Sequence, residues 1–198
     1  MKVLPLLAGL FALLAAAPAA ADPLAEVLLS FTLNGKPIPP EIFSDFGDAS
    51  LSDDKPIVVV IDARAAMDSN RYADPIRPRG DWIEQEKPGP GGINGPETMA
   101  YRYVGRTANG LLVLLAAWSG GGSGNFFWLH VLDARPARAF QTDGSLYERL
   151  DLALVRSYAL GDRWLGDVTI VGNAIRIQTE HSLGGSGAPS ETIEARRP

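Results

Sequence analysis

Three polar side chains able to hold a small ligand stand close together in the first half of the sequence. Asp68, Asn70 and Arg71 are followed by Tyr72. A carboxylate, an amide and a guanidinium in one short segment offer both acceptors and donors, and the Arg71 guanidinium suits an anionic or polar ligand. Asp and Asn also cap their own backbone in turns. We therefore predict a turn here, with Asp68, Asn70 and Arg71 as the candidate ligand-binding residues.

A serine, a histidine and an aspartate could together perform hydrolysis. Ser123 lies in a glycine-rich segment, His130 in an apolar run, and Asp62 or Asp133 could complete a triad. Such triads assemble in space, so sequence spacing does not exclude one. However, the run that contains His130 is apolar on both faces, which is typical of a buried core histidine. A hydrolase remains an alternative, and we assign no residue as catalytic.

The glycine-rich segment Gly120–Gly124 does not match the known catalytic or phosphate-binding loops. A P-loop needs Lys and Ser/Thr after its last glycine, and here Asn125 and Phe126 follow. A nucleophile elbow around Ser123 would need glycine at position 125. The segment therefore predicts a loop between two strands.

The sequence also argues against a metal, a cofactor and nucleic acid. It has no cysteine and two histidines without ligand spacing, and its acidic cluster at 45–54 lacks the spacing of a calcium loop. The formal net charge is −5, and the arginines are scattered. We expect no cofactor, no metal site and no nucleic-acid partner.

The first 21 residues have the layout of a cleaved signal peptide. Lys2 precedes an apolar stretch over residues 4–17, and Pro18 and three alanines follow. A transmembrane helix needs about 20 good apolar residues, which this segment does not supply. We expect cleavage after Ala21 and, without cysteines, neither a lipid anchor nor disulfides.

Abundant glycine and proline, 21 and 15 residues, separate short runs of β-forming residues. One short helix is expected at 39–46 and a loop at 67–95. Strands are expected at 27–33, 57–62, 99–105, 111–118, 126–133, 149–155, 168–171, 174–179 and 192–194.

Two pairs of strands carry turn signals that predict their register. A two-residue turn at Asn109-Gly110 would place Tyr101 opposite Trp118. The turn Gly172-Asn173 would place Ile170 opposite Ile175 and Val168 opposite Ile177 on one face. A further loop is expected at 161–163.

These elements predict a single mainly β domain over residues 22–180. Consecutive hairpins favour an antiparallel sandwich or a coiled sheet. The alternative is an α+β fold with short helices at 39–46 and 63–73. Residues 181–198 are polar and predict a partly flexible tail.

Two short motifs give a family resemblance over residues 58–179. Gly121-Gly122-Ser123-Gly124-Asn125-Phe126 and the later Leu160-Gly161-Asp162-Arg163 resemble segments of uncharacterised exported bacterial proteins. The resemblance implies a β-rich protein in the periplasm of a Gram-negative bacterium. It implies no activity and transfers no functional residue.

These observations favour a soluble periplasmic protein that is a non-catalytic binding or interaction domain. Its partner would be an envelope protein or a small ligand, and its aromatic residues could form a binding face. Besides the hydrolase, the other alternative is an inhibitor or immunity-type protein with the 84–96 loop as its plug.

Overall fold

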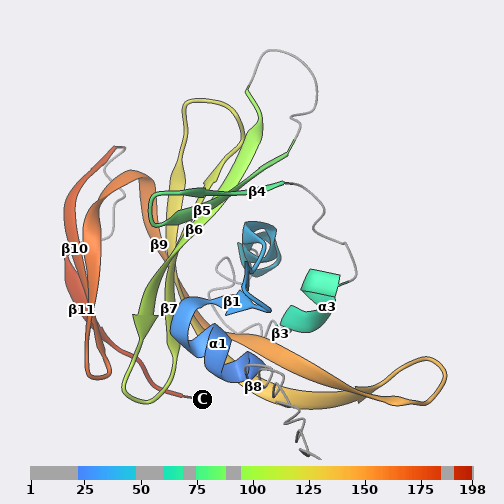
Figure 1. Ribbon diagram of the computed structural model, residues 1–198. Helices are drawn as coiled ribbons and strands as arrows, with labels where there is room; N and C mark the ends of the chain where they lie inside the picture. Colours follow the sequence, from blue (N-terminus) through green and yellow to red (C-terminus); the bar gives the residue numbers. More distant parts are fainter. Residues whose placement is uncertain (1–21, 48–59, 69–74, 88–94, 184–189, 198) are drawn as a thin grey trace, which may run out of the picture.

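The computed structural model describes residues 22–47, 60–68, 75–87, 95–183 and 190–197 (Figure 1). The fold is mainly β, as predicted, and consists of one large antiparallel sheet of consecutive hairpins with short helices on one face. Its strands follow the order β11-β10-β9-β8-β7-β6-β5-β4, and β3 pairs with β9 beside this path. Their bounds are β3 Val60–Asp62, β4 Ile76–Arg79, β5 Trp82–Lys87, β6 Glu97–Arg106, β7 Leu112–Ser119, β8 Phe126–Phe140, β9 Leu146–Val171, β10 Ala174–Leu183 and β11 Glu191–Glu194.

The chain begins with a helix where we predicted a strand over 27–33. Helix α1, Pro23–Ser30, starts at Asp22, whose carboxylate accepts a hydrogen bond of 3.0 Å from the backbone N–H of Leu24. Proline in the first turn and an aspartate before it are strong helix starts. The apolar run at 27–33 therefore divides between the helix and the small hairpin of β1, Thr32–Leu33, and β2, Lys36–Pro37.

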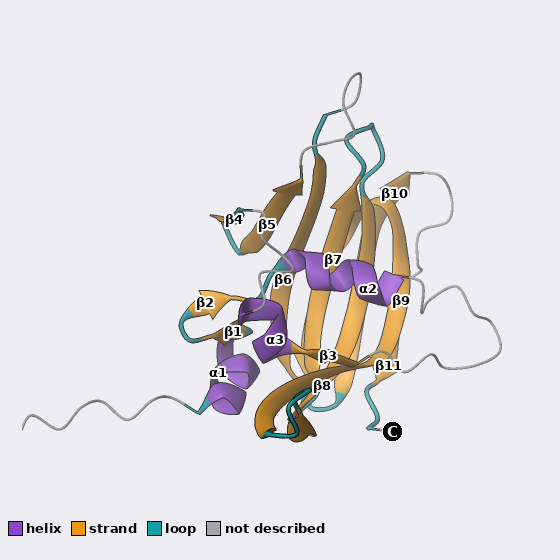
Figure 2. Cartoon of the chain, turned by 90° about the vertical axis from the view of Figure 1, so that its right-hand side faces the viewer, coloured by secondary structure: helices purple, strands orange, loops and turns teal. Residues whose placement is uncertain are grey.

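The helix predicted at 39–46 is present as two short turns. The 3₁₀ helix η1, Pro40–Phe43, continues into α2, Ser44–Gly47. The 63–73 segment, offered as a helix in the alternative fold, begins as α3, Ala63–Asp68. Figure 2 shows these helices in front of one face of the sheet.

Two predictions in the first half of the sheet are wrong. The expected loop at 67–95 contains the hairpin β4–β5, whose two-residue turn Gly80-Asp81 joins Arg79 to Trp82. The glycine, prolines and charged residues of this segment are typical of a loop, and for that reason a loop was expected. In the structure, Arg77 and Arg79 of β4 form ion pairs with Glu86 and Glu84 of β5 at the edge of the sheet. The 57–62 run was expected to be a buried strand. Within the described residues it forms the short β3, in which Val60 is exposed.

The β6–β7 hairpin exists, but its predicted register is wrong by two residues. Tyr101 lies opposite Ala116, and Trp118 lies opposite Met99. The connection spans Thr107 to Leu111 rather than two residues, and the Thr107 N–H donates to the Leu111 carbonyl at 2.9 Å. From Thr98 to Tyr103 the shift is two residues, so these side chains keep their predicted face, whereas the irregularity at Val104 reduces the shift to one residue from Gly105 onward.

Strand β9 continues through residues 161–163, where a loop was expected. Gly161 and Arg163 have φ of 110° and 48°, and the strand passes from pairing with β8 to pairing with β10 around them. The β9–β10 register is confirmed, with Ile170 opposite Ile175 and Val168 opposite Ile177. The edge strand expected at 192–194 is β11.

The sheet is buried on both faces in its centre. Leu112, Leu114 and Ala116 face the core under the helices, whereas Leu111, Val113 and Leu115 face a second core. The second core is closed by the end of β9 and by β10, because the sheet coils back at this side (Figure 1). The candidate functional site lies on the helical face.

Candidate functional site

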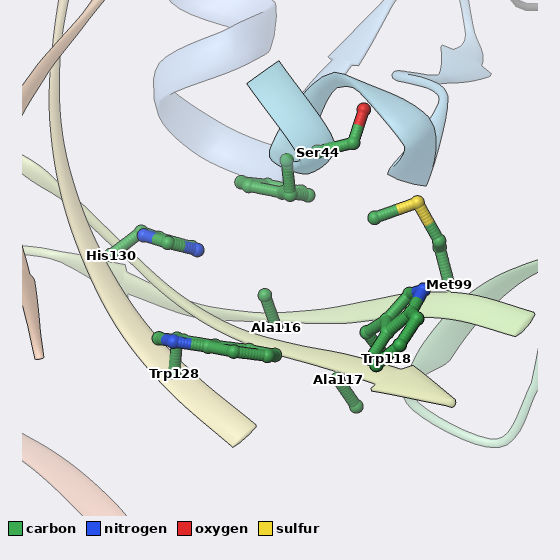
Figure 3. A pocket seen from close by; sticks show the side chains of 8 residues that line it. Ser44, Met99, Ala116, Ala117, Trp118, Trp128 and His130 are labelled. Carbon is green, nitrogen blue, oxygen red and sulfur yellow. The ribbon is translucent and has the colours of Figure 1, made fainter. Parts of the chain in front are cut away.

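An apolar pocket of about 210 Å³ lies between η1–α2 and the sheet (Figure 3). Its walls come from η1 and α2 on one side and from β6, β7 and β8 on the other. All the described residues that line it are uncharged: Phe43, Ser44, Met99, Ala116, Ala117, Trp118, Trp128 and His130.

Alternation along two paired strands builds the sheet side of this pocket. Ala116 lies opposite Trp128, and Trp118 lies opposite Phe126, so all four side chains point to the helical face. Ala116 is small, and it leaves room between the two tryptophans. Phe43 comes from more than 70 positions away in the sequence and covers this room from the helical side.

His130 is the polar group at the inner end of the pocket. It is 2% exposed, and its ring lies parallel to that of Phe43, with centroids 5.2 Å apart and planes 5° apart. Burial lowers the pKa of His130 to about 3, because the apolar surroundings disfavour the charged imidazolium. The imidazole is therefore neutral at ordinary pH.

Two polar atoms beside this pocket lack hydrogen-bond partners among the described residues. They are His130 Nδ1 and the hydroxyl of Ser157, and both are buried. His130 and Ser157 are directly opposite each other on β8 and β9, so their side chains leave the sheet on the same face. Neither atom is accessible from the pocket, whereas the Nε2 end of the His130 ring projects into its space (Figure 3).

The outer end of the pocket continues into partly exposed aromatic rings. Phe126 is 39% exposed and lies 5.9 Å from Trp118 and 6.4 Å from Trp128, measured between ring centroids. The Trp118 indole N–H donates to a carboxylate oxygen of Glu97 at 2.8 Å, which fixes the orientation of that ring. Phe126 therefore extends the aromatic surface formed by Trp118 and Trp128 to the solvent.

A second, open groove lies on the other face of the sheet. It measures about 670 Å³ and is lined by Trp82, Arg102, Phe127 and the glycine-rich loop. Arg102 crosses it with ion pairs to Asp81 at 3.3 Å and to Asp167 at 3.4 Å. The positive charge of Arg102 in this groove is therefore already neutralised by these two carboxylates.

The predicted ligand-binding segment lies largely outside the described residues. Asp68 ends α3, and nothing is described of its side chain, of Asn70 or of Arg71. The predicted plug at 84–96 falls partly in β5, and its residues 88–94 are also outside the described part.

The residues of the hydrolase alternative have separate neighbours. Ser123 lines the groove on the opposite face from His130. Asp62 accepts a backbone hydrogen bond from Arg64 at 3.1 Å at the start of α3, and Asp133 pairs with Arg197 at 3.4 Å. His130 has the buried core position that the sequence predicts. These placements bring neither His130 nor Asp62 nor Asp133 to Ser123.

Sequence reasoning did not identify the pocket. Aromatic residues were expected to form a binding face, and Trp118 and Trp128 are among the aromatic residues of the sequence. Phe43, Met99 and Ala116 gave no functional signal, since each is typical of an ordinary core. The alternation of Ala116 with Trp118, opposite Trp128, is the one pattern that could have indicated a gap in the packing.

No family model matches the sequence, and neither the curated proteins nor the solved structures contain a significant match. Within the described ranges, no helix has both the length and the apolar character needed to cross a membrane. The same ranges contain no group of three or more histidine, aspartate or glutamate side chains that could hold a metal ion.

Proposed function

We propose that this protein is a non-catalytic binding domain that holds a small apolar molecule in the His130 pocket. The observation that carries the proposal is the pocket itself, whose described lining residues are all uncharged and which borders the main core at Phe43, Met99 and Ala116. Ligand sites are typically concave and mostly apolar, with few polar groups that fix the ligand's orientation. Here those groups are His130 and Ser44.

The resemblance of the two motifs and the signal-like first 21 residues support a place of action in the periplasm. In that compartment the protein would carry or sense an apolar compound of the cell envelope. The inhibitor alternative has less support, because residues 84–87 of its plug segment belong to strand β5 rather than to a projecting loop.

A fluorescent neutral probe tests the binding function. N-phenyl-1-naphthylamine becomes bright when it leaves water, so titration of the purified protein should give a saturable signal with one site per chain. Replacing Ala116 by Leu fills the middle of the pocket and should weaken binding at least tenfold. Ala139→Leu, at the far end of β8 from the pocket, is the matched control. Equal binding by both variants would contradict the assignment of the site.

A further inference from the structure

The polar atoms at the inner end of the pocket restrict the chemistry of its ligand. His130 lines the pocket, and its Nδ1 atom is buried at the strand side of the ring, beside Ser157 on the paired strand, so that Nε2 is the nitrogen at the pocket end of the ring. The His130 ring projects into the space above Ala116 and Trp128 (Figure 3). A ligand hydroxyl in this space could pair with Nε2 at the tip of the ring, and a purely hydrocarbon ligand could not.

The electrostatics of the pocket select against a charged ligand. Every described lining residue is uncharged. The neutral imidazole supplies no cation, and the nearby carboxylate of Glu97 adds negative charge beside Trp118. A ligand carboxylate or phosphate would lose its hydration without gaining an ion pair, which is strongly unfavourable.

The shape of the pocket favours flat rings. Phe43, Trp118 and Trp128 present aromatic faces and edges, and Met99 lies beside Trp118. A cavity of roughly 150 Å³ is enough for benzene, so a volume of about 210 Å³ suits one ring or two fused rings, and the phenyl group of N-phenyl-1-naphthylamine would extend out of the pocket toward the partly exposed Phe126. Offset and edge contacts between such a ring and the tryptophans add to the gain from burial.

We infer that the pocket selects uncharged aromatic alcohols, with the ring against Trp118 and Trp128 and the hydroxyl at His130. This inference rests on the proposed function, since it names the ligand class of the same site.

Three ligands with one ring system test the inference by displacement of N-phenyl-1-naphthylamine. 2-Naphthol should bind about five- to tenfold more tightly than naphthalene, which is the effect of one added hydrogen bond. 2-Naphthoate, which is anionic at pH 7.5, should bind more weakly than either. These comparisons use the unaltered protein, so they do not depend on the folding of a variant.

A variant then locates the hydroxyl. His130→Phe keeps the ring against Phe43 but removes both nitrogens, so the ratio between 2-naphthol and naphthalene should fall to about one. Ala139→Leu, at the far end of β8 from the pocket, is the control and should leave the ratio unchanged.

The outcomes separate the two proposals. Equal affinity of the unaltered protein for naphthol and naphthalene, or tightest binding of naphthoate, overturns the ligand class but leaves an apolar site. An unchanged ratio in His130→Phe overturns the role of His130. Failure of all three compounds and of the probe to bind overturns the proposed function itself.

Discussion

The carboxylate of Asp162 accepts a hydrogen bond of 2.8 Å from the backbone N–H of Asn125, and this contact joins the two motifs of the sequence. The neighbouring Arg163 completes the connection. Its backbone N–H donates to the Asn125 carbonyl at 2.6 Å, and its guanidinium Nε donates to the Ser123 carbonyl at 2.8 Å. The bend of β9 therefore fixes the end of the glycine-rich loop, which forms one wall of the open groove.

Replacing Asp162 by Ala should weaken this connection. The Asn125 N–H loses a charged acceptor, so we expect the free energy of unfolding to fall by about 1–2 kcal/mol. Urea denaturation measures the loss, and hydrogen exchange at the Asn125 amide should accelerate. Asp167→Ala, on the same strand but 56% exposed, is the control and should cost no more than about 0.5 kcal/mol. Equal losses in the two variants would show that the Asn125 contact is unimportant.

The parts of the fold that the sequence predicted correctly are those specified by local turns. Gly172-Asn173 is a two-residue turn between β9 and β10, and each of these strands has one apolar face. The length of the turn and the alignment of the two apolar faces require the same β9–β10 register, which the structure has. The β6–β7 register was wrong because Asn109-Gly110 lies inside a longer connection, which the Thr107 hydroxyl stabilises by accepting from the Leu111 N–H at 2.9 Å. That interaction depends on the folded loop and has no periodic signal.

The first helix shows how an apolar run can mislead. Residues 27–33 have the composition of a strand, but the start signal for a helix lies before them, at Asp22 and Pro23.

The pocket could not be predicted from the sequence for a different reason. It depends on Phe43 packing over Ala116, and nothing in either local sequence specifies that long-range contact.

The N-cap of α1 offers a direct test of that start signal. Asp22→Ala removes the acceptor for the Leu24 N–H and should lower stability by about 1 kcal/mol. Asp22→Asn retains an oxygen acceptor and should be nearly neutral. Thermal unfolding followed by circular dichroism compares the two. A loss in Asp22→Asn as large as in Asp22→Ala would mean that charge, rather than capping, stabilises this end of the helix.

Gly166 is a position where β9 and β10 leave no room for a side chain. A Cβ there would lie 2.1 Å from the backbone oxygen of Gln178 and 2.5 Å from the Trp164 ring. Gly166→Ala must displace one of them, so we expect a loss of about 1–3 kcal/mol in urea denaturation. Gly122→Ala is the matched control, since a Cβ at that position meets nothing within 4 Å. A stable Gly166→Ala variant would contradict the close approach of these strands.

Burial of His130 should make the stability of the protein depend on pH. The pKa of this imidazole is lowered from 6.5 to about 3 in the folded protein, so only the unfolded chain binds a proton between these values. The unfolded state therefore gains free energy from protonation as the pH falls below 6.5, and the folded state does not. The stabilisation is complete above pH 6.5 and is lost progressively toward pH 3.

Urea denaturation at pH 7.5 and 5.5 measures this effect where most carboxylates remain ionised. We expect the free energy of unfolding to be about 1 kcal/mol lower at pH 5.5, because a tenfold excess of protonated over neutral imidazole in the unfolded chain contributes about 1.4 kcal/mol. The experiment uses a His181→Gln background, so that His130 is the one histidine left to titrate. Adding His130→Phe should remove the difference between the two pH values. If the difference persists in that variant, other groups cause it, and the imidazole of His130 is not held neutral by its surroundings.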